Sequence, residues 1–282
     1  MVPIQSGRLL RGVRYRWERL RWRIWPGARG RRRVVRARGL RFTLQCDNWI
    51  THYRWRTYNA KEPETLDWID GAMQAGGMLF DVGANIGLYS IYAALRHRGM
   101  RVIAFEPEYA NLHLLRDNLL ENGLQDRVDV YAIALSDVTG LSWLHVQDLT
   151  PGAALHAESP QALRRTLAQR PVVWREGIAA WTLDQFCEEA RLAPNFLKID
   201  VDGSEPRVLE GAAKILSAAS LRSVLIERPQ DPLAAERCEE LLREAGLTRQ
   251  GRREAAGSPN EIWNRAAATR VDRAQDRCES NR

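Results

Sequence analysis

The chain has 282 residues, a net charge of +7 and a mean hydropathy of −0.41, and 45% of its residues are hydrophobic. This length accommodates one large α/β domain with additions, and the composition is typical of a globular protein. It contains no run of 18 apolar residues, which argues against a membrane-spanning helix. The cysteines have neither a CxxC pair nor a metal-ligand spacing, and no apolar signal segment opens the chain. We therefore expect a reducing, cytoplasmic location.

The basic charge is confined to the beginning of the chain. Residues 1–60 contain sixteen arginines and only two acids, Glu18 and Asp47, a net charge of +14, so residues 61–282 carry −7. At helical pitch, the apolar residues of segment 8–25 fall on one stripe and its arginines lie outside that stripe. The sequence therefore predicts a basic amphipathic helix.

Three interpretations of this helix stay open. Arginines beside an apolar stripe suit peripheral contact with an anionic membrane, at the inner face for a cytoplasmic protein. The helix would equally suit packing against its own domain. A nucleic-acid arm is a weaker reading, because no DNA- or RNA-binding module follows it. We treat residues 1–60 as a basic N-terminal arm.

A β-hairpin is predicted around Arg38-Gly39, where apolar and polar residues alternate on both sides of the turn. Segment 47–60 is rich in aromatic residues, and a helical pattern follows from residue 61 to Met73. This part of the chain either covers the ligand site or seals the edge of a sheet.

The most informative stretch runs from Met78 to Ser90. A strand-length apolar segment ends at Asp81, Gly83 and Gly87 follow with three residues between them, and a helical pattern then begins. Such a strand, tight loop and helix lets a ligand approach bare backbone, with unpaired N–H groups at the helix start.

A second buried strand, residues 101–106, ends in Glu106, 25 residues beyond Asp81. In a nucleotide-binding βαβ unit an acid at this position accepts hydrogen bonds from ribose hydroxyls. The alternative roles are a helix cap or a solvated loop charge, and we favour the ribose. A helix and a third strand near residues 128–133 follow. Residues 138–180 are interpreted as a β insertion near the site, and its histidines, His145 and His156, are expected at the surface.

Another buried strand, residues 196–199, leads into three acids within six residues, Asp200, Asp202 and Glu205. Acids crowded at the carboxyl end of a strand indicate a cation or polar ligand. A further strand ends at Glu227, and a helix and a hairpin complete a domain spanning residues 61–265. Residues 266–282 form a charged tail expected to be flexible.

These motifs, Asp81 to Gly87, Glu106 and Lys198 to Glu205, resemble the FkbM family of S-adenosylmethionine-dependent methyltransferases. The resemblance covers about residues 58–250. It implies an α/β, Rossmann-like class I methyltransferase with seven mostly parallel strands, an antiparallel last strand and helices on both faces. Two positions depart from the family pattern: Asp202 stands where glutamate is usual and Ser204 where alanine is frequent.

The resemblance also implies roles for individual residues. Gly83 and Gly87 would line the methionine part of S-adenosylmethionine, with Asp81 orienting their loop and the amino group, and Asn85 between them would also contact the cofactor. Glu106 would hold the ribose, and a loop containing Ala134, Ser136 and Asp137 would flank adenine. Asp200 would face the sulfonium, close to Glu205 and Glu227.

Methylation of a hydroxyl needs a group that takes its proton, and the candidates are Asp200, Glu205, Glu227 or a histidine of the site. We favour Asp200 or Glu227. A divalent metal between these two acids is compatible with the chemistry, but no ligand spacing requires one.

We therefore predict an O-methyltransferase acting on a glycan, glycolipid or secondary metabolite. The alternatives are a nucleic-acid methyltransferase using the arginine-rich arm and a non-catalytic membrane-associated scaffold. Nucleic acid is disfavoured because the chain lacks the Pro-Cys and Asn/Asp-Pro-Pro-aromatic motifs of base methylation. A dehydrogenase is disfavoured because Asn85 occupies the middle glycine position of the dinucleotide fingerprint.

Overall fold

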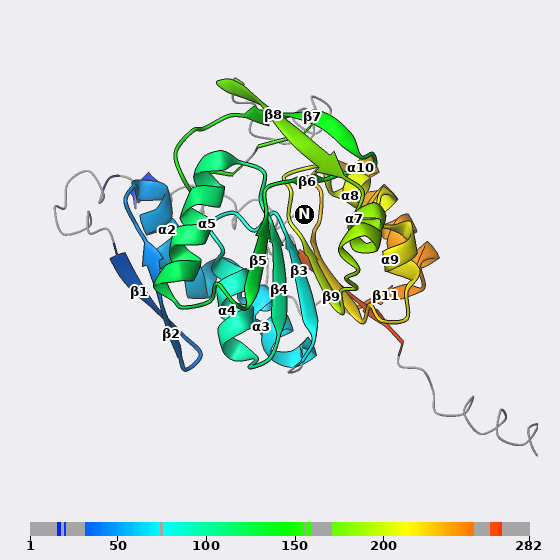
Figure 1. Cartoon of the computed structure of the whole chain (residues 1–282), viewed down its shortest axis with the longest axis horizontal. Coiled ribbons are helices and arrows are strands. Elements are labelled where there is room, and N and C mark those ends of the chain that lie inside the picture. The colour runs from blue at the N-terminus through cyan, green and yellow to red at the C-terminus, as the bar shows by residue number, and fades with distance from the viewer. Residues whose placement is uncertain are drawn as a thin grey trace, which may run out of the picture.

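A seven-stranded sheet forms the centre of the protein, with helices on both faces (Figure 1). The computed structural model describes residues 16, 17, 20, 32–73, 76–154, 156–158, 171–250 and 260–266. The strand order is β11-β12-β10-β9-β3-β4-β5. The strands are β3 (Met78–Val82), β4 (Arg101–Phe105), β5 (Val128–Tyr131), β9 (Phe196–Ile199), β10 (Ser223–Glu227), β11 (Leu247–Arg249) and β12 (Asn260–Arg265).

Five of these strands are parallel, and β12 is antiparallel to both of its neighbours, β10 and β11. The predicted mostly parallel sheet with an antiparallel last strand is therefore confirmed. Helices α3 (Pro63–Ala72), α4 (Leu88–Arg96) and α5 (Tyr109–Glu121) cover one face. Helices α7 (Leu183–Ala190), α8 (Glu205–Glu210), α9 (Ala213–Ser217) and α10 (Pro232–Glu244) cover the other.

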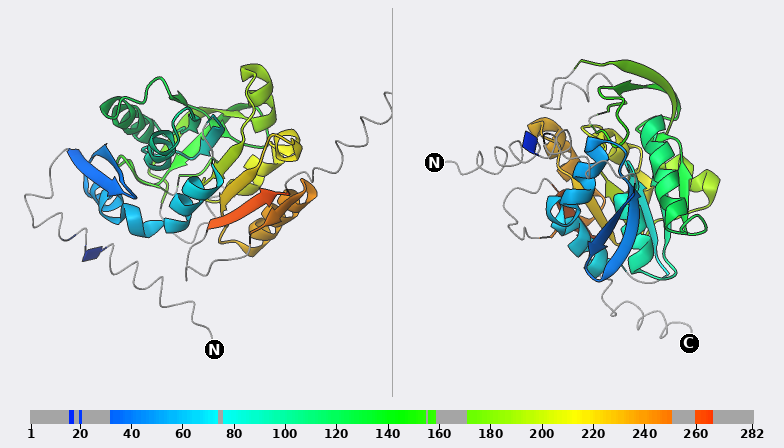
Figure 2. Two further views of the ribbon diagram at one scale, coloured as in Figure 1. Left: turned by 90° about the horizontal axis from the view of Figure 1, so that it is seen from below. Right: turned by 90° about the vertical axis from the view of Figure 1, so that its left-hand side faces the viewer.

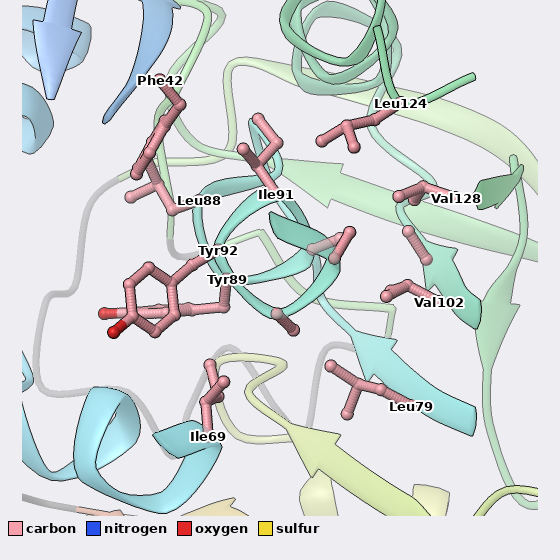
Figure 3. Close-up of a cluster of buried hydrophobic side chains, with 14 of the residues drawn as sticks. Phe42, Ile69, Leu79, Leu88, Tyr89, Ile91, Tyr92, Val102, Leu124 and Val128 are labelled. Carbon is pink, nitrogen blue, oxygen red and sulfur yellow. The ribbon is translucent and has the colours of Figure 1, made fainter. Parts of the chain in front are cut away.

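The two faces have separate hydrophobic clusters because successive side chains of a strand point to opposite sides. In β3, Leu79 packs toward α4 while Phe80 and Val82 pack toward α7 and α8. Figure 3 shows the α4 side, where Leu79 and Val102 lie beneath Ile91. Burying each such side chain contributes about 1.5–3 kcal/mol. Since both faces are covered, the carboxyl ends of the parallel strands are left as the place for a site.

The N-terminal hairpin is also confirmed. Strands β1 (Arg32–Ala37) and β2 (Leu40–Gln45) pair around a turn in which Arg38 and Gly39 have φ of 47° and 84°. The aromatic segment forms helix α2 (Trp49–Lys61), capped by Asn48. Side chains of β1, β2, α2 and α3 share one core cluster. Figure 2 shows the hairpin beside α2. The predicted division at residue 60 falls inside α2.

The predicted amphipathic helix 8–25 lies almost entirely outside the described residues. Of its members, Arg16, Trp17 and Leu20 are described, and they are helical and exposed. The tail from residue 267 lies outside the described residues as well. Within the described part of the chain, no helix is long and apolar enough to cross a membrane.

The predicted β insertion is present as a second, three-stranded sheet at the top of Figure 1. Its strands are β6 (Ala134–Leu135), β7 (Gly140–Val146) and β8 (Trp174–Trp181), in the order β6-β8-β7. The expected loop at 134–137 is thus partly wrong. Ala134 and Leu135 form a short strand because β8, about 45 positions further along the chain, supplies a parallel partner.

Candidate active site

A pocket opens beyond the carboxyl ends of β3, β4 and β9, where parallel α/β sheets bind their ligands. It encloses about 610 Å³, its open mouth included. Its polar lining contains Asn85, Glu106, Asn111, His156, Glu158, Asp200, Asp202 and Ser204; its apolar lining includes Val82, Phe105, Ile133, Ala134, Leu135 and Leu144. Strands distant in the sequence thus bring five of the eleven predicted site residues to the pocket lining: Gly83, Asn85, Glu106, Ala134 and Asp200.

Gly83 lets two strand ends approach each other at the floor of this pocket. Its φ is +77°, and a Cβ atom there would lie 1.9 Å from the carbonyl oxygen of Asp200. Gly87, at φ +85°, precedes α4, and a Cβ atom there would lie 2.4 Å from Leu115 Cδ1. Close packing against backbone therefore requires glycine at position 83, whereas at position 87 the positive φ is the main requirement, because the Leu115 side chain can shift.

Glu106 is held at the pocket wall by backbone donors. Its carboxylate accepts hydrogen bonds from Asn85 N at 2.8 Å and Glu108 N at 2.9 Å. Burial raises the pKa of Glu106 to about 7, against the opposing effect of these two N–H groups. Each oxygen keeps a second acceptor site, so the carboxylate can also receive the two hydroxyls of a ribose.

Lys198 joins two predicted site acids beneath the pocket. Its ammonium lies 3.3 Å from Asp81 Oδ1 and 3.4 Å from Asp200 Oδ2, and its side chain is 2% exposed. Although burial alone would lower the pKa of Lys198, Asp81 and Asp200 raise it above its ordinary value. Ser90 Oγ donates to Asp81 Oδ2 at 2.6 Å. Asp81 is thus committed to bracing β3 against β9 and α4, and it does not line the pocket.

Asp200 and Glu227 form a coupled pair of carboxyl groups. Burial and the charge of Asp200 raise the pKa of Glu227 well above its usual range. Burial would raise the pKa of Asp200 too, but Lys198 and the hydrogen bond from Glu227 hold it below the usual range. Within this pair, therefore, Asp200 is the stronger acid and Glu227 holds its proton to a higher pH. Only Asp200 of the two lines the pocket.

The same acids offer ligands for a cation. Oxygen atoms of Asp200, Asp202 and Glu227 all lie within 4.8 Å of one another. Three carboxylates at this spacing suit a hard divalent ion. Acidic clusters also occur without an ion, so this arrangement is compatible with a metal and does not require one.

Glu205, predicted as a catalytic candidate, supports the loop after β9. Its Oε1 accepts hydrogen bonds from Val201 N at 3.2 Å and Gly203 N at 3.1 Å. The side chain is 1% exposed, and Oε2 has no hydrogen-bond partner in the part of the chain that the structure describes. Burial raises the pKa of Glu205 to about 7. Its position favours a structural role, and its catalytic role stays a prediction.

Glu205→Gln is expected to reduce the loss of stability with rising pH. Because the folded state holds this proton more tightly than the unfolded chain does, the stability contribution is complete below pH about 4.5 and is lost as pH rises toward 7. Glutamine keeps Oε1 for both N–H groups and does not ionise. Urea unfolding at pH 5 and pH 8 should give a decline smaller by roughly 1–3 kcal/mol in the variant. An equal decline in both proteins would contradict the assignment.

The residues predicted to flank adenine divide into two groups. Ala134 and Leu135 line the pocket, whereas Ser136 and Asp137 lie behind it. Arg207 Nε donates to Asp137 at 2.9 Å, and Ser136 Oγ contacts Glu158 Oε2 at 3.2 Å. Ser136 and Asp137 therefore position the second sheet, and the predicted direct contact with adenine fits Ala134 and Leu135 better.

Residues 150–154, here called the strap, form a roof over the pocket, which Ala154 lines. They belong to the insertion expected near the site, but none of them was predicted individually. Asn85 and Asn111 donate side-chain hydrogen bonds to Ala153 O at 2.7 and 3.2 Å. On the other side, Asn48 Nδ2 donates to Pro151 O at 2.9 Å and Arg54 Nε donates to Gly152 O at 2.7 Å. The strap thus connects α5 and α2 with the glycine loop, the segment from Gly83 to Gly87 between β3 and α4.

His156 follows the strap and corrects the expectation that it is a surface residue. It lines the pocket, and neither buried ring nitrogen has a hydrogen-bond partner among the described residues. Burial lowers its pKa to about 4, so the imidazole is neutral at pH 7. A neutral imidazole can donate one hydrogen bond and accept another, so His156 is a polar group available to a ligand.

Comparison with known proteins identifies the family to which this site belongs. Residues 81–247, more than half of the chain, match the methyltransferase FkbM domain. The chain belongs to this family. The FkbM match contains Asp81, Glu106, Asp200 and Glu227, and it confirms the resemblance inferred from their motifs. Helix α2 lies outside it.

Individual relatives are similar over parts of the chain. The 31-O-demethyl-FK506 methyltransferase FkbM of Streptomyces tacrolimicus is 34% identical over 159 residues, which are 49% of this chain and 60% of that protein. A ribosomal protein L11 methyltransferase of Alteromonas mediterranea is 35% identical over 66 residues, 23% of this chain and 22% of that protein. The matches thus span less than two thirds of both relatives.

Among solved structures, a precorrin-6y C5,15-methyltransferase of Geobacter metallireducens gives a TM-score of 0.38 at 13% identity. The similarity covers 72% of this chain and 85% of that one. The FkbM chain's own strand order and its antiparallel β12 establish its Rossmann-like methyltransferase sheet.

Proposed function

We propose that this FkbM-family chain transfers a methyl group from S-adenosylmethionine to a hydroxyl of a glycan, glycolipid or secondary metabolite. The observation that carries the proposal is the single pocket in which Glu106 and Asp200 stand at the ends of β4 and β9, on either side of β3. The Streptomyces tacrolimicus relative is named for methyl transfer to a 31-O-demethyl compound, which supports an oxygen acceptor.

The order of the strands gives the orientation of the cofactor. Adenine would lie against Ala134 and Leu135, just beyond β5, and the ribose hydroxyls against Glu106, beyond β4. The methionine part would then lie over Gly83, between β3 and β9, and reach Asp200. The cradle at Gly83 fits this placement, since any side chain there would meet the backbone of Asp200. Bound S-adenosylmethionine supplies a methyl group already activated on a sulfonium.

Asp200 would orient the acceptor hydroxyl and accept its proton as the new bond between carbon and oxygen forms. Lys198 favours the ionised form of Asp200, and Glu227, whose pKa is raised by burial and by Asp200, does not line the pocket. Asp200 is a weak base, because its pKa is held low. Alignment of the hydroxyl with the methyl group would therefore supply much of the acceleration, and proton transfer would come late.

Asp200→Asn tests this role. Calorimetric titration with S-adenosylmethionine should give a dissociation constant on the order of 1 μM to 1 mM for the wild-type chain. The variant loses a charge that attracts the methionine ammonium, so its dissociation constant should rise by up to about tenfold. Transfer of radiolabelled methyl groups to fractionated cell-envelope glycans and lipids should fall at least roughly 100-fold. The exposed change Glu240→Gln serves as the control and should alter neither quantity.

Two outcomes separate the parts of the proposal. Absence of S-adenosylmethionine binding at millimolar ligand in the folded wild-type chain would refute the proposed function. Binding with full transfer in Asp200→Asn would leave the function standing and remove Asp200 from the proton transfer.

A further inference from the structure

Arg54, on α2, differs from the other cations around the pocket. Those cations are paired with carboxylates: Lys198 with Asp81 and Asp200, Lys61 with Glu62, and Arg207 with Asp137 and Glu158. Arg54 has no carboxylate within ion-pair distance among the described residues; its partner is the carbonyl oxygen of Gly152, which receives Nε–H at 2.7 Å. Four N–H groups on its terminal nitrogens are therefore left for another acceptor.

The strap fixes where this guanidinium lies. Gly152 N donates to Asn111 Oδ1 at 2.7 Å, and Asn111 lines the pocket. Ala154, two residues beyond Gly152, also lines it. Through its hydrogen bond to Gly152, Arg54 is thus held next to residues that line the pocket, and its side chain is half-buried. A partly buried guanidinium presents a rigid fork of donors that matches a carboxylate.

The charge of Arg54 affects the pKa of two residues that line the pocket, Asp200 and His156. Together with the larger effects of burial, Lys198, Glu227 and Lys61, it influences the pKa of Asp200. It also adds to the effect of burial in lowering the pKa of His156. Asp200 stands at the β9 end of the site, where the methionine part of the cofactor would lie.

The methionine end needs a cation for its carboxylate. The acids nearby, Asp200 and Asp202, can attract the ammonium group of methionine but repel its carboxylate. Lys198 is 2% exposed and already lies between two acids. We propose that Arg54 binds the carboxylate of the methionine part of S-adenosylmethionine. This inference rests on the proposed function and adds to the cofactor site a residue outside the FkbM match.

Cofactor fragments provide the test. S-adenosylhomocysteine carries the carboxylate, whereas 5′-methylthioadenosine keeps the adenosine and sulfur and lacks it. In calorimetric titration, Arg54→Gln should weaken the binding of S-adenosylhomocysteine by roughly 10- to 100-fold. The affinity for 5′-methylthioadenosine should change by less than about threefold. Arg54→Lys, which retains the charge without the fork, should fall between the wild type and Arg54→Gln.

Arg56→Gln is the matched control, because it removes an exposed arginine from the same helix, and it should change neither affinity. An unchanged affinity of Arg54→Gln for S-adenosylhomocysteine would overturn the assignment. An equal loss for both ligands would also overturn it, since a distorted strap would impair adenosine binding as well. If the wild-type chain bound neither ligand, the proposed function itself would fail. If the wild-type chain binds both ligands, a negative result with the variants refutes only the role of Arg54 and not the proposed function.

Discussion

Lys198→Met is expected to lower the free energy of unfolding by about 3–5 kcal/mol, because it leaves Asp81 and Asp200 without their shared cation. The side chain is 2% exposed, so water cannot replace the lost charge. Methionine fills a similar volume, and the loss therefore reports the charge. Urea unfolding at pH 7 measures it.

The surface change Lys214→Met provides a control for removal of a lysine, and it should cost less than about 0.5 kcal/mol. Adding Asp200→Asn to Lys198→Met removes one of the stranded charges. The double variant should therefore be more stable than Lys198→Met alone. A loss below about 1 kcal/mol in Lys198→Met, or no recovery in the double variant, would show that the pair of acids does not depend on this lysine.

The central sheet could be predicted because its signals are local. Each buried strand is a short apolar run, and four of them end in an acid that the fold places at the same edge: Asp81 one residue inside β3, Glu106 just after β4, Asp200 just after β9 and Glu227 at the end of β10. The glycine loop was also predictable, since a residue at φ +77° packed against backbone admits glycine alone. In these segments the local sequence pattern and the tertiary packing favour the same structure.

The roof of the pocket could not be predicted, because its residues owe their positions to partners far along the chain. Gly152 lies where it does through Arg54 and Asn111, 98 and 41 positions away. Nothing in the sequence around His156 distinguishes a buried imidazole from a surface one. The sequence predicted the wall that contains Gly83, Glu106 and Asp200 and an insertion near the site. It left open whether segment 47–73 covers the site and did not identify the individual residues of the roof.

The short strand β6 was not predicted, for a related reason. Two residues form no periodic pattern, and Ala134 and Leu135 become a strand only by pairing with Ala180 and Trp181. Gly211 shows how closely this region is packed, since a Cβ atom there would lie 2.0 Å from Ser136 O. The second sheet thus rests directly on the turn after α8, which fixes Ala134 and Leu135 against the pocket.

Among substitutions that add a single methyl group within the site, Gly83→Ala is expected to be the most damaging. The backbone conformation alone would cost about 1–2 kcal/mol with a side chain. In addition, the new Cβ atom would lie 1.9 Å from Asp200 O and 2.9 Å from its carbonyl carbon. Neither atom can move without separating β3 from β9. We expect a total loss on the order of 4 kcal/mol or more in urea unfolding, with binding of S-adenosylhomocysteine abolished.

Gly39→Ala separates the two causes, because Gly39 has a similar φ of +84° and nothing lies within 4 Å of a Cβ atom there. It should cost about 1 kcal/mol and leave ligand binding unchanged. The difference between the two variants then measures the close approach of the strand ends. If Gly83→Ala were no worse than Gly39→Ala, backbone conformation alone would explain the glycine. The contact between the two strand ends would then not be what holds Asp200 at the floor of the pocket.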